Sequence, residues 1–414
     1  MFPNVTVYTK QKTVMNKITT VLLTLITLNV FGQGGSKIGT ESPDLEFSRI
    51  LNFKNPSAKL SDFGSKVVLI DFWATWCAPC IASFPHLEEL QKKFSADLQV
   101  ITITGESEDR IKKFLEKRKV NLPIVIDAKR ELENYFPHRT VSHTVIIDKD
   151  GIIRAITTPS EVSEEIIKKV ISNEPISILE KKDVMDFDPS KPLSGNENFT
   201  YQITVTPYQE GVPSMSNATG GKGGYANRRI FATNLSAQSL YEIAYQFPTS
   251  IRTVVEVKDR TAFDWNKQNA ICFDLIVPEN KGEQRFEIMQ QQLDVLFNYE
   301  VKVEDRIKPV KVLRIIHGEK AKLIPSNGEE KISSYSGNGL SMKNSESRII
   351  ADFLAIQFNK PVVDKTGLSG LYSVELNWFN ENPDQIHQEL KKFGLELVDE
   401  ELKIEVLVIS DKIN

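Results

Sequence analysis

The chain has 414 residues, 40% of them hydrophobic, and a formal net charge of -4. Basic and acidic side chains are well mixed along it, so the sequence lacks the clustered basic charge of a nucleic-acid-binding protein. The length exceeds that of one typical domain and predicts two or three. Three cysteines are too few for a disulfide-stapled scaffold.

The N-terminal segment has the features of an export signal. Met15 offers a start, Lys17 a positive charge, and residues 18–31 are mostly apolar or threonine and carry no charge. This apolar run of about 14 residues is shorter than the roughly 17–25 that a membrane-spanning helix needs, which favours a cleavable signal within residues 1–32. An uncleaved anchor is the alternative. In either case we expect an extracytoplasmic protein, in the periplasm, either soluble or tethered by this segment.

Residues 67–80 hold the most informative pattern of the chain. Residues 67–72 form an apolar, β-branched run that predicts a buried strand, and apolar side chains then recur at helical spacing. Cys77 and Cys80 therefore stand at the start of a helix, where unpaired N–H groups and the helix dipole favour the reactive thiolate. A zinc site or an inert thiol pair is the alternative. Zinc usually takes four ligands, and the one further cysteine, Cys272, lies in an apolar strand pattern that predicts a buried structural thiol.

The cysteine pair and its neighbours suggest a division of roles. We expect Cys77, exposed at the helix start, to attack a substrate disulfide, and Cys80, one turn further in, to resolve the mixed disulfide. Trp76 and Pro79 are expected to shape the turn and limit solvent access. Asp71 lies within the apolar strand, where burial raises the pKa of a carboxyl group and suits it to exchange a proton with Cys80; a capping role is the alternative. No metal or organic cofactor is expected, because the cysteine pair is itself the redox group.

The rest of the first half alternates between strands and helices. The expected elements are a strand at 98–104, a helix at 107–119, a short segment at 122–127, a short helix at 132–136, a hairpin at 144–154 with an Asp-Gly turn, and a closing helix at 163–171. This order predicts an α/β domain over residues 40–173.

The run Asp-Phe-Trp-Ala-Thr-Trp-Cys-Ala-Pro-Cys at residues 71–80, followed by Phe84 and Pro85, resembles the thioredoxin superfamily and, within it, the extracytoplasmic TlpA/ResA type. The resemblance implies a thioredoxin-like fold for the N-terminal half, with Pro85 kinking the helix and Asp71 handling the proton. It also implies that the substrates are protein thiols or disulfides. Reduction is implied rather than oxidation, with electrons supplied by a membrane donor.

Two residues, Ser142 and Ser83, depart from this family. The alignment puts Ser142 where relatives have a cis-proline facing the cysteine pair. A non-proline cis bond costs about 2.5–4 kcal/mol, so we expect the Val141–Ser142 bond to be trans or strained. His143 follows, and either reaches the site or is a packed or solvated side chain. Ser83 stands where ResA-type members have a glutamate, so any proton transfer by an acidic side chain must involve Asp71. These departures support an alternative function, an extracytoplasmic protein-binding module with a catalytically weakened thioredoxin fold.

The second half has a different character. Residues 174–198 are charged, contain prolines and show little periodicity, which predicts a linker. Residues 199–414 predict an α+β domain with an internal duplication, in which Asn234 opens a helix of the first copy and Asn344 the corresponding helix of the second. The strands that end the two copies are expected at residues 299–303 and 310–316, and at 395–398 and 403–409.

Residues 199–411 resemble a bacterial domain family of unknown function that is common in soil bacteria. A weaker resemblance to small periplasmic domains at the entrance of outer-membrane secretins and receptors implies protein binding. The Asp-Lys-Thr-Gly run at 364–367 predicts a tight turn, with a catalytic role as the alternative, and residues 220–224 predict a flexible loop. Together these features predict an exported thiol-disulfide oxidoreductase whose C-terminal domain recruits a partner or substrate.

Overall fold

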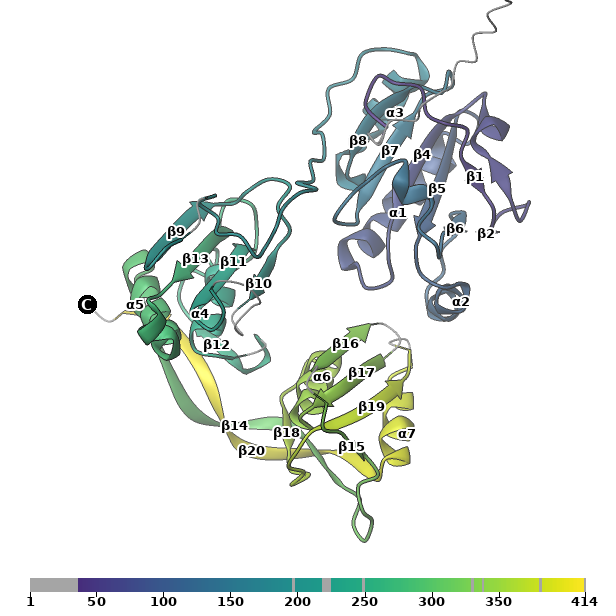
Figure 1. The fold of residues 1–414 in the computed structure, drawn as a ribbon. Coiled ribbons are helices and arrows are strands. Elements are labelled where there is room, and N and C mark those ends of the chain that lie inside the picture. The colour runs from purple at the N-terminus through teal and green to yellow at the C-terminus, as the bar shows by residue number, and fades with distance from the viewer. Residues whose placement is uncertain are drawn as a thin grey trace, which may run out of the picture. The chain divides into compact units, whose positions relative to one another are not determined.

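A computed structural model of the protein describes residues 36–412, apart from residues 196–197, 218–224, 248–249, 329–330, 337–338 and 380–381 (Figure 1). The expected export signal within residues 1–32 and the glycine-rich loop 220–224 lie outside the described residues. In the described part of the chain, every helix is too short or too polar to span a lipid bilayer.

The first domain is built on a six-stranded sheet with the order β2-β6-β5-β4-β7-β8. Its strands are β2 (Ile50–Leu51), β4 (Val67–Phe72), β5 (Leu98–Thr104), β6 (Ile124–Ile126), β7 (His143–Ile147) and β8 (Ile153–Thr157). The central strand β4 runs parallel to β5 and antiparallel to β7. Because side chains alternate along a strand, Leu69 and Trp73 enter one core layer and Ile70 and Phe72 the other. Burial of both faces explains why this strand reads as a continuous apolar run.

Helices complete the first domain. They are α1 (Ala78–Lys93), α2 (Glu108–Lys117) and α3 (Glu164–Ile171), with the short helices η1 (Leu60–Phe63), η2 (Leu132–Asn134) and η3 (Pro159–Glu161), and a two-stranded ribbon of β1 (Glu46–Phe47) and β3 (Ala58–Lys59). The turn between β7 and β8 contains Gly151 at a φ of 81°, which a glycine adopts without strain. This order of strands and helices confirms the predicted thioredoxin-like fold. The expected helix at 132–136 is a single short turn.

Part of the expected linker belongs to the first domain. Residues 176–183, which we call the strap, run along β8. Ile176 and Ile178 pack against the core, the Lys181 amide donates to the Ile156 carbonyl at 2.9 Å, and Thr157 Oγ1 donates to the Leu179 carbonyl at 2.7 Å. The strap thereby covers the outer edge of the sheet, which would otherwise offer unpaired backbone groups to another chain.

An ion pair holds the end of the strap. Lys181 pairs with Asp183, and the two side chains are 10% and 7% exposed. Thr140 Oγ1 also donates to Asp183 Oδ1 at 3.1 Å. This contact ties the strap to the segment that leads into β7.

We expect Asp183→Ala to lower the free energy of unfolding by about 2–3 kcal/mol, because it leaves the Lys181 ammonium group buried without its partner. Urea unfolding followed by tryptophan fluorescence measures the change. The double variant Lys181→Met/Asp183→Leu is the control and should recover most of the loss. A loss below about 0.5 kcal/mol for Asp183→Ala, the size typical of an ordinary surface substitution, would contradict a structural role of the strap.

The C-terminal domain consists of two copies of one arrangement. The first copy comprises β9 (Gln202–Pro207), β10 (Met215–Asn217), β11 (Arg229–Leu235), α4 (Ala237–Ala244), β12 (Thr253–Glu256), β13 (Ile271–Ile276), α5 (Arg285–Leu296) and β14 (Tyr299–Ile315), with the short helices η4 (Ser250–Arg252) and η5 (Glu279–Gln284). The second comprises β15 (Ile324–Pro325), β16 (Ile332–Ser336), β17 (Gly339–Ser345), α6 (Arg348–Phe358), β18 (Val362–Asp364), β19 (Tyr372–Asn377), α7 (Asp384–Lys392) and β20 (Leu395–Asp411).

The sheets repeat with the same connectivity, which confirms the predicted duplication. The order β10-β11-β13-β9 in the first copy corresponds to β16-β17-β19-β15 in the second. Asn234 and Asn344 occupy equivalent bulges at φ values of 52° and 50°, and each side chain accepts a backbone N–H, from Gln209 and Gly328 respectively. The copies also exchange strands, since β12 pairs with β20 and β18 pairs with β14.

The strands that end the copies differ from the prediction. Each is one strand of 17 residues rather than two shorter ones, and the two pair antiparallel along their whole length (Figure 1). The charged side chains in the middle of β14 are accommodated because they form ion pairs there. Arg306, for example, pairs there with Glu256 and Glu304.

The Asp-Lys-Thr-Gly run and Cys272 both have structural roles in this domain. Asp364 accepts hydrogen bonds from the Thr366 amide at 2.8 Å and from Ser347 Oγ at 3.0 Å, so the Asp-Lys-Thr-Gly run is the tight turn that was expected rather than a set of free side chains. Cys272 is fully buried, and its thiol donates to Asn234 Oδ1 at 3.3 Å. It is the buried structural thiol that its surroundings predicted.

Candidate active site

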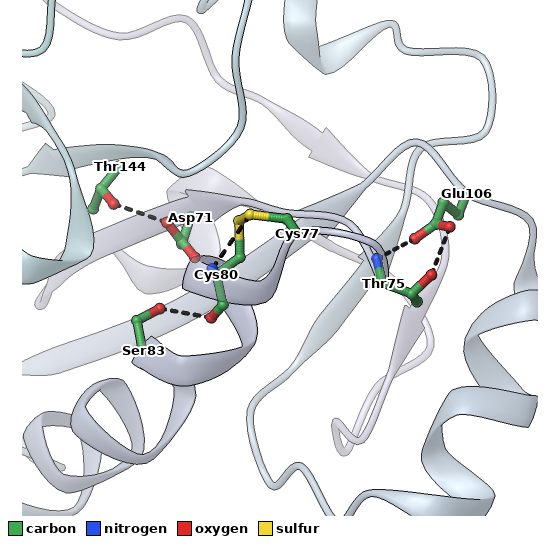
Figure 2. The surroundings of a disulfide bond; sticks show 7 residues. All are labelled: Asp71, Thr75, Cys77, Cys80, Ser83, Glu106 and Thr144. Carbon is green, nitrogen blue, oxygen red and sulfur yellow. Dashed lines mark hydrogen bonds between the residues drawn. A yellow bond between two sulfur atoms is a disulfide. The ribbon is translucent and has the colours of Figure 1, made fainter. Parts of the chain in front are cut away.

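The predicted cysteine pair lies at the start of α1 and is joined by a disulfide bond (Figure 2). Cys77 is the residue that caps the helix, and the Cys80 amide donates to Cys77 Sγ at 3.3 Å. Pro79 lies in the first turn of the helix, where an N–H group would have no partner within the helix. Amide groups and the helix dipole at a helix start of this kind favour the thiolate form of a reduced cysteine.

The exposure of Cys77 differs from the prediction. Cys77 is 7% exposed and Cys80 fully buried, because in the disulfide form both belong to the core layer that contains Trp73 and Phe84. The accessible surface at this point is formed instead by the residues around Cys77. Trp76 is 62% exposed, and the intervening Ala78 and Pro79 are also exposed.

Asp71 lies behind the disulfide, on the same face of β4 as Leu69 and Trp73. Its side chain is fully buried, and burial raises the pKa of the carboxyl group to about 7, against the opposing effect of a hydrogen bond from Thr144. Thr144 Oγ1 donates to Asp71 Oδ1 at 2.8 Å, whereas Oδ2 has no hydrogen-bond partner. The expected rise in the pKa of Asp71 is therefore confirmed, and its carboxyl group accepts no backbone hydrogen bond of the kind that a capping role would require.

His143 does not lie beside the disulfide. It pairs with Phe72 across β4 and β7, so its side chain lies on the face opposite to Asp71. It is 3% exposed and stacks on His138 with a ring separation of 4.5 Å. Both ring nitrogens lack hydrogen-bond partners, and burial lowers the pKa of His143 strongly. His143 is therefore a packed side chain and does not reach the disulfide.

Ser142 immediately precedes β7 and is half-buried. The described part of the chain has no cis peptide bond, so the bond before Ser142 is trans, as expected. It lies one residue before the part of β7 that pairs with β4, which begins at His143.

Sequence reasoning missed two residues of the site, Thr144 and Glu106. Thr144 is the partner of Asp71 described above. Glu106 accepts hydrogen bonds from the amide and the hydroxyl of Thr75, at 2.6 and 2.9 Å, and so fixes the turn that leads into Trp76 and Cys77 (Figure 2). The signal for Glu106 was its place just after β5, because the carboxyl ends of neighbouring parallel strands meet at one edge of a sheet.

Ser83 also has a defined contact. Its hydroxyl donates to the Cys80 carbonyl at 2.7 Å. The side chain at this position is therefore bonded to its own helix rather than directed at a substrate.

Comparison with known proteins places both halves in families. Residues 38–156 match the AhpC/TSA family, and residues 238–412 match a protein family of unknown function, DUF3738. The chain is 30% identical over 141 residues to the thiol-disulfide oxidoreductase ResA of Geobacillus kaustophilus, which covers 33% of this chain and 79% of the relative. It is also 30% identical over 142 residues to the thioredoxin-like protein YneN of Bacillus subtilis, covering 33% and 80%.

A solved structure is also similar to part of the chain. The thioredoxin domain of a thiol-disulfide oxidoreductase from Bacteroides vulgatus is 25% identical, with a TM-score of 0.28, and the match covers 34% of this chain and 98% of that domain. The relatives and the cysteine pair at the helix start agree with each other. The chain therefore belongs to the ResA-type thiol-disulfide oxidoreductases of the thioredoxin superfamily, and carries in addition a C-terminal domain from a family of unknown function.

Proposed function

We propose that the protein is exported and reduces disulfides in protein substrates through Cys77 and Cys80, with Asp71 as the proton-exchanging group. The observation that carries this proposal is the arrangement at the start of α1, where the disulfide has a helix terminus on one side and a buried carboxyl group behind it. Export is supported by the charged start and apolar run of residues 15–31.

The reaction proceeds in two exchanges. The Cys77 thiolate attacks one sulfur of a substrate disulfide; a mixed disulfide forms, and the other substrate sulfur leaves as a thiolate and takes a proton from water. Cys80 then gives its proton to the Asp71 carboxylate and attacks Cys77 Sγ. The mixed disulfide breaks, the second substrate sulfur leaves, and the Cys77–Cys80 bond forms, so two electrons have passed to the substrate. A dithiol on a membrane donor restores the pair by the reverse exchange.

A redox titration of residues 33–414 in dithiol and glutathione buffers tests the direction. Alkylation and mass spectrometry follow the states of Cys77 and Cys80. A reversible two-electron transition near about -270 mV, the thioredoxin value, is expected for a reductant. A value near about -120 mV would reverse the direction.

Ser142 favours a second candidate function, a protein-binding module with a weakened thioredoxin fold. The residue is not a proline, and the bond before it is trans. Absence of any reversible Cys77–Cys80 pairing in the same titration would replace the enzyme proposal with this one.

We further propose that the C-terminal domain recruits a partner or substrate. Its support is that two residues with catalytic potential have structural roles, Asp364 in a turn and Cys272 in the core. Ending the chain after residue 198 should leave reduction of a small synthetic disulfide unchanged and slow reduction of the physiological protein substrate. Equal rates on both would contradict a recruiting role.

A further inference from the structure

A row of buried polar side chains crosses the sheet of the first domain at the level of Asp71. Strand register pairs Asp71 with Thr102 on β5 and with Thr144 on β7, and pairs Thr144 with Thr157 on β8. Paired residues on neighbouring strands lie on the same face. All four side chains are fully buried, in a sheet whose other inward positions are largely apolar. Burying a hydroxyl group without a hydrogen bond destabilises the folded state. The hydrogen-bond partner of each threonine therefore indicates the role of its hydroxyl.

The three threonines have different partners. Thr102 Oγ1 donates to the Pro123 carbonyl at 3.0 Å, and Thr157 Oγ1 donates to the Leu179 carbonyl of the strap at 2.7 Å. Both of these hydroxyl groups therefore donate to backbone carbonyls. Thr144 alone of the three donates to a titratable group, Asp71 Oδ1, at 2.8 Å. A hydroxyl has one hydrogen to donate, and an ionised carboxylate only accepts, so Thr144 is the donor whenever Asp71 is ionised.

We propose that Thr144 is a positioning residue of the disulfide site: its hydroxyl holds Asp71 Oδ1 and leaves Oδ2 as the oxygen that exchanges a proton with Cys80. This inference rests on the proposed function. Figure 2 shows the Asp71 carboxyl group between Thr144 and the disulfide, and Oδ2 has no hydrogen-bond partner of its own. In the resolving step the Cys80 S–H bond breaks, its proton passes to Oδ2, and its electron pair forms the bond to Cys77 Sγ. The substrate thiolate leaves with the electrons of the mixed disulfide.

The hydrogen bond also opposes the effect of burial on Asp71. Burial raises the pKa of Asp71 to about 7, and the Thr144 hydrogen bond lowers it, because it stabilises the charged form. Titratable and charged side chains lie on the elements packed on either face of this sheet, among them Cys77, Cys80, His86, Glu88 and Glu89 of α1, Glu106 after β5, Arg110 of α2, Glu164, Glu165, Lys168 and Lys169 of α3, and His138 and His143. The hydrogen bond from Thr144 is the side-chain interaction that lowers the pKa of Asp71.

The row provides matched substitutions for a test. Thr144→Val removes the hydroxyl that contacts Asp71 and keeps the shape of the side chain. Thr102→Val and Thr157→Val remove buried hydroxyls from the same row that do not contact Asp71. Thr144→Ser keeps the donor. In the full oxidised chain, carbon-13 NMR of the aspartate carboxyl groups follows the titration of Asp71, and Asp71→Asn identifies its signal.

We expect the Asp71 titration midpoint to rise by about one pH unit or more in Thr144→Val, the size of a lost hydrogen bond to a charged group. Thr102→Val, Thr157→Val and Thr144→Ser should keep the wild-type midpoint. The pH dependence of disulfide reduction by a dithiol, followed by tryptophan fluorescence, should move with the NMR midpoint. In Asp71→Asn, adding Thr144→Val should have no further effect on this rate.

An unchanged midpoint in folded Thr144→Val, or an equal shift in Thr157→Val, would overturn the proposal. If Thr144→Val does not fold, Thr144→Ala is measured in its place. The NMR titration needs no turnover, so it tests Thr144 even where the redox titration fails. A wild-type pair that no dithiol reduces would overturn the proposed function while the carboxyl titration still decides the role of Thr144.

Discussion

Replacing Cys80 by serine should stop the reaction at a mixed disulfide between Cys77 and the substrate. Cys77 can still attack, because its position at the helix start does not depend on the Cys80 side chain. Resolution fails, because the remaining cysteine of the chain, Cys272, is fully buried in another domain and hydrogen-bonded to Asn234. Turnover of a protein disulfide should fall to the uncatalysed background.

Mass spectrometry under non-reducing conditions should find the adduct on Cys77 in Cys80→Ser. Cys77→Ser is the matched control and should give neither adduct nor turnover. Cys272→Ser should keep full activity. Continued turnover by Cys80→Ser would mean that Cys77 alone, or another thiol, carries the reaction, and would remove Cys80 from the proposed mechanism.

Asp71→Asn should make the oxidised protein more stable at neutral and alkaline pH. The pKa of Asp71 is raised to about 7 in the folded state, compared with about 3.9 in an unfolded chain. Between these values the folded state binds more protons than the unfolded state, so stability falls as pH rises. The destabilisation is absent below about pH 4 and complete above about pH 7. At about 1.36 kcal/mol for each pKa unit the full effect is about 4 kcal/mol.

The neutral amide of asparagine avoids this destabilisation but leaves a buried N–H group without a partner, which costs about 1–2 kcal/mol. A net gain of about 2–3 kcal/mol is therefore expected near pH 8, with no gain near pH 4. Urea unfolding of the oxidised chain at several pH values measures it, and the exposed Asp97→Asn serves as the control. The same Asp71→Asn substitution should slow dithiol exchange at neutral pH. A stability difference that does not change with pH would contradict the raised pKa.

Features that depend on short-range pattern could be predicted from the amino-acid sequence. The strand, the cysteine pair and the helix of residues 67–94 are contiguous, so spacing alone placed Cys77 and Cys80 at a helix terminus. The apolar run around Asp71 was enough to predict its burial and the rise in its pKa. The duplication of the C-terminal half was also visible, because each copy repeats the same order of apolar segments and the same asparagine before a helix.

Tertiary structure alone decided which side chains meet across the sheet. His143 follows Ser142 directly, yet the alternation of β7 puts it on the face away from the disulfide, and Thr144, one residue further, contacts Asp71. A shift of one residue in register would have exchanged these two roles. The strap and the 17-residue strands of the C-terminal ribbon could likewise not be predicted from the sequence. Both are stabilised by pairing with distant strands rather than by a periodic pattern of their own. Local sequence pattern thus identifies the cysteine pair and Asp71, whereas strand register decides that Thr144, and not His143, contacts Asp71.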